Sequence, residues 1–117
     1  MKRLVQAFGN SLAALKYGLV NESALRQELI LLLISLPLAP FLTLDPWKLI
    51  ALWGALLLVL AVEFLNTGIE KLADRVTTEH DNLVKIAKDC GSAAVLMSLL
   101  IAAMVWGLVV AEWLGIL

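Results

Sequence analysis

Residues 49–70 read LIALWGALLLVLAVEFLNTGIE, and they decide the fold class. From Leu49 to Val62 there is no charged residue, which is typical of a helix inside a bilayer. Four polar side chains then follow at spacings of 3, 4 and 4, namely Glu63, Asn66, Glu70 and Asp74. At about 3.6 residues per turn these positions share one helix face. The stretch therefore predicts a membrane helix whose polar end carries an acidic stripe, formed by those four residues.

The composition of the whole chain agrees with a membrane protein. Of its 117 residues 62% are hydrophobic and 16% charged, and the mean hydropathy is +0.92. So few charges cannot cover a water-soluble domain of this size. The net charge of −1, without a basic stripe, gives no support for nucleic-acid binding. Cys90 is the only cysteine, so no disulfide forms within the chain, and we expect a single integral membrane domain over residues 1–117.

The apolar pattern divides the chain into four helical segments. Large apolar residues recur every three or four positions from Leu4 to Leu19, which predicts an amphipathic surface helix over residues 2–20. Transmembrane helices are predicted over residues 24–44, 47–70 and 90–115, with Pro37 kinking the first of them or ending it early. The polar segment 77–89 predicts a loop followed by a helix start. The expected fold is therefore all-α, with a surface helix and three spans.

Basic residues are unevenly distributed between the two sides of the membrane. One side has Lys2, Arg3, Lys16, Arg26, Lys71, Arg75, Lys85 and Lys88, and the other has only Lys48. The positive-inside rule places the amino terminus in the cytoplasm, so the acidic stripe faces the compartment that holds ATP. Polar residues interrupt the first apolar run, so we expect no cleaved signal peptide.

Glu63 is the most informative single residue, because a carboxylate at the edge of the hydrocarbon costs free energy unless it is paired, solvated or protonated. Two explanations are open: an ion pair between helices, for instance with Lys88, or a general base that takes a proton from an alcohol at the membrane surface. Glu70 lies about 10 Å further along the axis, so it cannot act on the same atom. Glu70 and Glu22 suit Mg²⁺, which one or two carboxylates usually hold together with nucleotide phosphates. Two solvated glutamates are the alternative.

Lys88 and Asp89 stand where the third span enters the membrane. A lysine there either neutralises phosphate charge or extends its side chain to the interface. His80 has no His or Cys partner at ligand spacing, which indicates an exposed loop residue. Neither a G-x-x-x-x-G-K-[ST] phosphate loop nor a Gly-rich kinase loop is present, so no nucleotide site of those kinds is expected.

Three segments resemble the small prokaryotic diacylglycerol kinases. They are NESALRQE at 21–28, VEFLNTGIE at 62–70 followed by Asp74 and Arg75, and AKDCGSAAV at 87–95. The resemblance implies a homotrimer of three-span subunits with composite active sites at the subunit boundaries. It also implies Mg²⁺ as cofactor and ATP as co-substrate, and it accounts for a kinase that lacks a phosphate loop.

The resemblance assigns a role to each matching position. Glu63 would accept the proton with support from Asn66, while Glu22 and Glu70 would hold the metal that bridges ATP. Besides these two glutamates, the implied nucleotide contacts are Arg3, Asn10, Glu79, His80, Asp81, Lys88 and Asp89. The implied lipid contacts are Arg3, Ala24, Leu25, Arg26, Gln27, Glu28, Glu63 and Ser92. Family members often have a tyrosine where this chain has Asn10. Asn10 can hydrogen-bond a nucleotide but cannot stack on it. They also often have an aromatic residue where this chain has Leu25.

The expected function is phosphorylation of diacylglycerol to phosphatidic acid by Mg-ATP, at the cytoplasmic face of the inner membrane. Undecaprenol kinases share the acidic stripe, so the stripe alone does not choose the lipid, whereas NESALRQE favours diacylglycerol. Two other classes stay open. A small ion carrier would also need intramembrane carboxylates, although here the polar groups gather at one end of the spans. A non-catalytic membrane assembly subunit would show no ATP-dependent phosphorylation of lipid.

Overall fold

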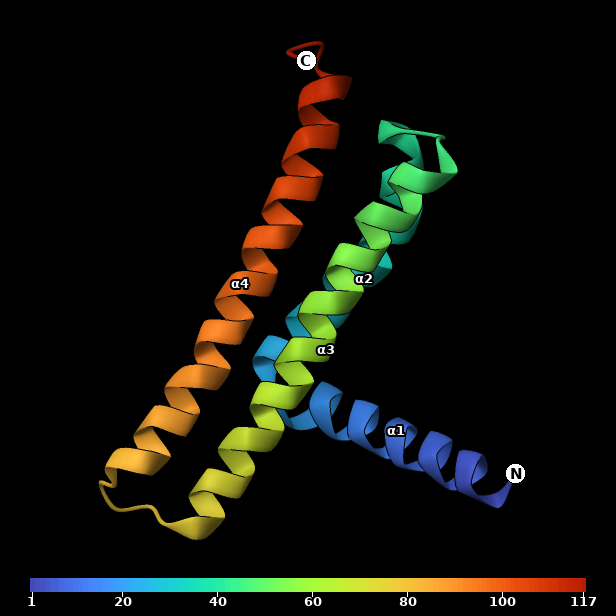
Figure 1. Cartoon of the computed structure of the whole chain (residues 1–117). Helices are drawn as coiled ribbons and strands as arrows, with labels where there is room; N and C mark the ends of the chain where they lie inside the picture. The colour runs from blue at the N-terminus through green and yellow to red at the C-terminus, as the bar shows by residue number, and fades with distance from the viewer.

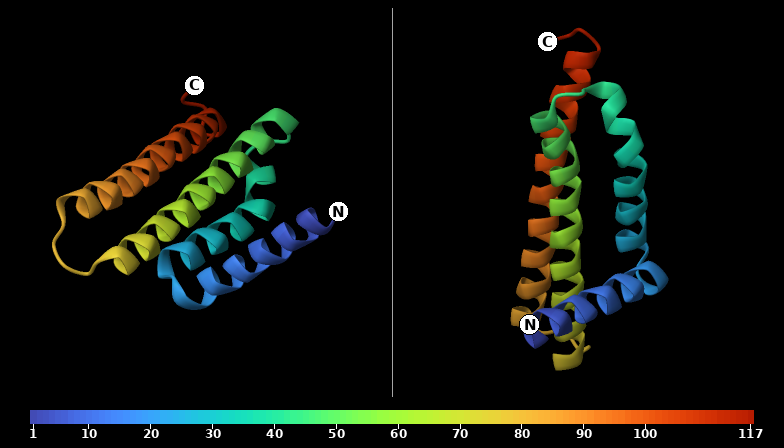
Figure 2. Two further views of the ribbon diagram at one scale, coloured as in Figure 1. Left: turned by 60° about the horizontal axis from the view of Figure 1, so that its bottom comes forward. Right: turned by 90° about the vertical axis from the view of Figure 1, so that its right-hand side faces the viewer.

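The computed structural model describes residues 1–117 as four α-helices joined by short connections. The helices are α1 (Lys2–Asn21), α2 (Ser23–Leu42), α3 (Pro46–Val76) and α4 (Asn82–Trp113). The helices α2, α3 and α4 run along the long axis of the molecule, and α1 projects away from them (Figure 1). Figure 2 shows α3 between α2 and α4. Because α2, α3 and α4 are each long and apolar enough to cross a membrane, the predicted all-α membrane fold is confirmed.

The two ends of this bundle differ, and we name them by their connections. The loop end carries residues 77–81 between α3 and α4, and the far end carries residues 43–45 between α2 and α3. At the far end Asp45 Oδ1 accepts a hydrogen bond from Trp47 N at 2.9 Å, with Pro46 as the first helical residue of α3. At the loop end Asp81 Oδ1 accepts from Val84 N at 3.0 Å. Side-chain caps therefore fix where α3 and α4 begin.

The helices α3 and α4 are longer than the predicted spans 47–70 and 90–115, whereas α2 ends at Leu42, before the predicted end at 44. Segment 77–89 contains a loop and then the start of α4 at Asn82, as the prediction had it. The 31 residues of α3 and the 32 of α4 correspond to about 47 Å each, which exceeds the roughly 30 Å hydrocarbon core. Pro37 does not end α2 early, because the helix continues to Leu42. Its 20 residues correspond to about 30 Å, enough for one crossing.

The core is small and follows α3. Two buried clusters form it, Ala39 with Leu52 and Val109 near the far end, and Ala55 with Val59 and Ala102 further along. The indole of Trp53 donates to Ser35 O at 3.0 Å, and that of Trp106 donates to Leu52 O at 3.0 Å. These bonds join α3 to both neighbours, as interhelical hydrogen bonds do in membranes. Only 13 of the 117 residues are buried, so most apolar side chains are left to face lipid.

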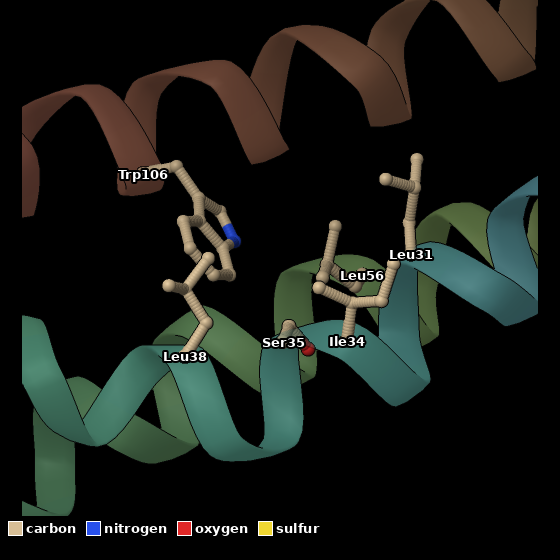
Figure 3. Close-up of a pocket in the computed structure, with 6 residues that line it drawn as sticks. All are labelled: Leu31, Ile34, Ser35, Leu38, Leu56 and Trp106. Carbon is tan, nitrogen blue, oxygen red and sulfur yellow. The ribbon is translucent and has the colours of Figure 1, made fainter.

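An apolar cavity of about 170 Å³ lies between α2, α3 and α4 (Figure 3). It is lined by Leu31, Ile34, Ser35, Leu38, Leu56 and Trp106. Its one hydroxyl belongs to Ser35 and donates to Leu32 O at 2.6 Å. Because no charged side chain lines it, this cavity supplies neither an ion path nor a catalytic group. The polar groups that can support chemistry lie elsewhere, toward the loop end.

The helix α1 is anchored through its last turns. Gly18 is buried, and a Cβ there would lie 2.9 Å from Leu25 Cδ1 and 3.3 Å from Phe64 Cε1. The guanidinium of Arg26 donates to Leu19 O at 3.1 Å, which satisfies a carbonyl in the last turn of α1. The corner between α1 and α2 is thereby brought against Phe64 of α3, the residue next to Glu63, while the first turns of α1 point away (Figure 1).

Candidate functional site

The acidic stripe lies on the part of α3 that approaches the loop end, as its spacing predicts. Glu63 and Asn66 are partly buried, whereas Glu70 and Asp74 are exposed. No hydrogen bond or ion pair joins Glu63 to another residue of the chain. The stripe thus passes from a half-buried pair beside the apolar segment to two solvated carboxylates beyond it.

Two oxygen atoms near Glu63 are buried without a hydrogen-bond partner. They are Glu28 Oε2 on α2 and Asn66 Oδ1 on α3. Glu28 and Glu63 are both partly buried on the neighbouring helices α2 and α3. A buried acceptor without a donor costs about 1–3 kcal/mol. An incoming hydroxyl group would relieve part of that cost, because it can donate its single hydrogen to one of these acceptors.

Asn66 is held by the contact between α3 and α4. Its Oδ1 fills the space that a Cβ at residue 91 would take, and the α4 residue there is the buried Gly91. The small residue therefore lets the amide approach α4, which is how small residues act at membrane helix interfaces. The next residue on α4, Ser92, is exposed.

Lys88 does not pair with Glu63, which corrects one of the two explanations left open for that carboxylate. Lys88 Nζ instead lies 2.6 Å from Asp74 Oδ1, the last member of the stripe. Asp89 pairs with Lys85 at 2.7 Å within α4. Both pairs are exposed to solvent, so each can be exchanged for a charged ligand at small cost.

Glu22 occupies the single non-helical position between α1 and α2. Its Oε1 lies 3.1 Å from Lys71 Nζ and accepts a hydrogen bond from the Tyr17 hydroxyl at 3.5 Å. Lys71 Nζ also lies 5.7 Å from the centroid of the Tyr17 ring, a cation–π distance. The Glu22 carboxylate is thus brought next to the residue that follows Glu70 on α3.

A shallow polar pocket of about 180 Å³ lies at the loop end. It is lined by Glu79, His80, Asp81, Val84, Lys85, Lys88 and Asp89. The structure therefore brings together the predicted nucleotide residues of segment 79–89. His80 is exposed, as expected.

The other predicted residues are dispersed. Arg3 and Asn10 lie on exposed turns of α1 and form no hydrogen bond or ion pair within the chain. Ala24 and Gln27 are exposed on α2, whereas Leu25 is fully buried and Arg26 closes the corner with α1. One subunit therefore does not gather all the predicted contacts into one site.

A metal ion would find only part of a ligand shell in one chain, because no group of three or more His, Cys, Asp and Glu side chains comes together. Mg²⁺ does not require such a group, since one or two carboxylates and the nucleotide phosphates usually hold it. The Lys71 ammonium shows that a cation fits against Glu22. Glu22 could therefore hold a divalent ion together with nucleotide phosphates.

Comparison with known proteins identifies the family of this chain. The family model for prokaryotic diacylglycerol kinase matches residues 9–110. The chain belongs to this family. A diacylglycerol kinase of Escherichia coli strain K12 is 38% identical over 104 residues, covering 89% of this chain and 85% of the relative.

Two further relatives carry the same name. The diacylglycerol kinase of Haemophilus influenzae is 39% identical over 107 residues, 92% of this chain and 91% of the relative. That of Helicobacter pylori is 41% identical over 110 residues, 91% of this chain and 83% of the relative. The resemblance expected from the sequence is confirmed, and the chain is a membrane lipid kinase. Every predicted site residue except Arg3 falls inside the matched range.

Sequence reasoning missed two residues at the site, Tyr17 and Lys71. Tyr17 was given no role and Lys71 served only to indicate the membrane orientation, since no spacing rule links residue 17 to residue 71. Their contact depends on the angle at which α1 crosses α3, which no local pattern encodes.

Proposed function

We propose that the protein phosphorylates diacylglycerol to phosphatidic acid, with Mg-ATP as phosphoryl donor, at the cytoplasmic face of the inner membrane. The observation that carries the proposal is the place of Glu63 within a chain of this family. It is a carboxylate at the end of the apolar part of α3, beside two buried oxygens without partners. A lipid whose hydroxyl lies at the interface could reach that position without leaving the bilayer.

In this proposal Glu63 is the general base. The lipid hydroxyl oxygen forms a bond to the γ-phosphorus while the bond from that phosphorus to the ADP oxygen breaks. Glu63 takes the hydroxyl proton, and ADP leaves with the electron pair of the broken bond. Asn66, held by Gly91, fixes the position of the hydroxyl relative to Glu63. The lipid-side contacts are Arg3, Ala24, Leu25, Arg26, Gln27, Glu28 and Ser92.

Glu22 and Glu70 are the proposed ligands of the divalent ion. When bound, Mg²⁺ neutralises charge on the transferring phosphoryl group. Lys88 adds a positive charge to the same region by exchanging Asp74 for phosphate. Asp89, Glu79, His80 and Asp81 line the shallow pocket and contact the nucleoside end, with Arg3 and Asn10 supplied by α1.

A homotrimer would complete the site. Three large apolar side chains are exposed close to the loop end, where α3 and α4 extend beyond the hydrocarbon core. Their exposed fractions are 71% for Leu72, 74% for Val76 and 78% for Leu83. Side chains of this kind need cover from another copy of the chain. A second subunit would also bring predicted contacts that one chain leaves apart.

One assay tests the reaction and the lipid together. Purified protein in mixed micelles receives γ-labelled ATP and either diacylglycerol, undecaprenol or ceramide, with and without Mg²⁺. We expect labelled phosphatidic acid only when diacylglycerol and Mg²⁺ are both present. Faster labelling of undecaprenol would favour the second candidate, an undecaprenol kinase, which the shared stripe permits. Labelling without a divalent ion would contradict the metal role.

A further inference from the structure

The cluster of Tyr17, Glu22 and Lys71 has no role in the mechanism above beyond that of Glu22. Its members come from α1, the corner after α1, and α3. Glu22 Oε1 is contacted by both partners, by Lys71 Nζ at 3.1 Å and by the Tyr17 hydroxyl at 3.5 Å. The side chain of Glu22 is 28% exposed and that of Lys71 57%, so the ammonium reaches the carboxylate from the solvent side. We call these residues the Tyr17 cluster.

The position of Lys71 conflicts with a metal on the same carboxylate. Mg²⁺ approaches its oxygen ligands to about 2.1 Å and carries two charges. An ammonium at 3.1 Å from the same oxygen would repel that ion and compete for the same lone pairs. One of the two cations must leave when the other binds. The lysine is the mobile one, because it stands on a flexible side chain that is more than half exposed.

We propose that Lys71 is an internal counter-ion of the Glu22 metal site. Before metal binds, it holds the Glu22 carboxylate between α3 and the Tyr17 hydroxyl. The divalent ion displaces it, and the lysine then leaves the face of the Tyr17 ring. Lys71 is a positioning residue in this scheme, since it touches neither ATP nor lipid. The inference rests on the proposed role of Glu22 as a metal ligand.

The first expected consequence concerns metal affinity. Lys71→Met removes the competing charge, so Mn²⁺ should bind about two- to fivefold more tightly, an effect kept small by solvent screening. Lys71→Arg retains the charge and should bind Mn²⁺ within twofold of the unchanged protein. Lys16→Met is the matched control, because it removes an exposed lysine of α1 that forms no ion pair. It should leave Mn²⁺ binding unchanged.

The single tyrosine provides a direct probe. Replacing it biosynthetically with 3-fluorotyrosine gives one ¹⁹F resonance from position 17 of the full-length protein in micelles. Mn²⁺ bound at Glu22 should broaden that resonance through its unpaired electrons, and Glu22→Gln should abolish the broadening. Titration midpoints of the variants then report the affinity without any need for enzyme activity.

A second measurement uses the unchanged sequence, so it holds even if a Lys71 variant fails to fold. Diamagnetic Mg²⁺ should shift the ¹⁹F resonance of the unchanged protein, because the ammonium of Lys71 leaves the face of the Tyr17 ring. A resonance that saturable Mg²⁺ binding does not move would overturn the proposal.

The outcomes separate the two proposals. If Glu22→Gln abolishes broadening but Lys71→Met binds Mn²⁺ no more tightly than the unchanged protein, the counter-ion role is wrong and the metal site stands. If Glu22→Gln is broadened as much as the unchanged protein, Glu22 is not a ligand and both proposals fail.

Discussion

The far end and the loop end of the bundle are built differently. At the far end the indoles of Trp53 and Trp106 donate to backbone carbonyls, and Lys48 Nζ lies 2.7 Å from Glu112 Oε1. Toward the loop end Glu28 and Asn66 each leave a buried oxygen without a partner. The difference indicates that the far end supplies stability, while the region around Glu63 keeps polar groups available for a substrate.

The strongest test of this division is Glu63→Gln. We expect activity toward diacylglycerol to fall by about 10²- to 10⁴-fold, because an amide cannot accept the hydroxyl proton. Glu112→Gln makes the same chemical change at the far end and should leave turnover close to that of the unchanged protein. Turnover in mixed micelles and the thermal unfolding midpoint are measured for both. Near-normal turnover of Glu63→Gln would remove the base assignment.

The next effect in size comes from Gly91→Ala. The added methyl group would occupy the position of Asn66 Oδ1, so the amide must move. Overpacking of this kind costs about 1–3 kcal/mol of stability. Misplacement of a positioning group can lower turnover by as much as about 100-fold. Gly107→Ala, on the same helix with open space around it, should be neutral or stabilising. Equal turnover of the two variants would show that the contact of Asn66 with α4 is not required for activity.

Trp106→Phe should weaken the far end without affecting the chemistry. It keeps an aromatic ring but loses the hydrogen bond to Leu52 O, which contributes about 1 kcal/mol. The unfolding midpoint in detergent should fall while turnover is retained. Trp113→Phe is the control, since that indole is 58% exposed and forms no hydrogen bond. A loss of turnover in Trp106→Phe with an unchanged midpoint would contradict the division between the two ends.

The smallest effect is expected from Lys48→Met. Its ion pair with Glu112 is exposed, with 41% and 45% of the two side chains accessible, so its loss should barely move the unfolding midpoint. Lys88→Met removes an exposed pair of similar length at the loop end and should reduce phosphoryl transfer. A matched loss of activity in both variants would indicate a general effect of charge rather than a role for Lys88.

Patterns that repeat along one helix could be predicted from the sequence. The stripe from Glu63 to Asp74, the apolar helices and the surface helix all follow from the spacing of polar and apolar residues. The start of a helix within the polar segment 77–89 was also expected, and the cap at Asp81 fixes it at Asn82. Features that depend on how two helices cross were not accessible, since the contact of Asn66 with Gly91 and that of Tyr17 with Lys71 are set by packing.

The unequal lengths of the spans have a consequence for the membrane. The helix α2 is only about 30 Å long and is bounded by Glu22 and Asp45, whereas α3 and α4 are each about 47 Å long and exceed the thickness of the hydrocarbon core. A thicker bilayer would draw the ends of α2 into hydrocarbon before it affected its longer neighbours. Because Glu22 directly precedes α2, a thicker bilayer would bring its carboxylate closer to the hydrocarbon. Membrane thickness would thus bear on Glu22 before it affected any residue of α3 or α4.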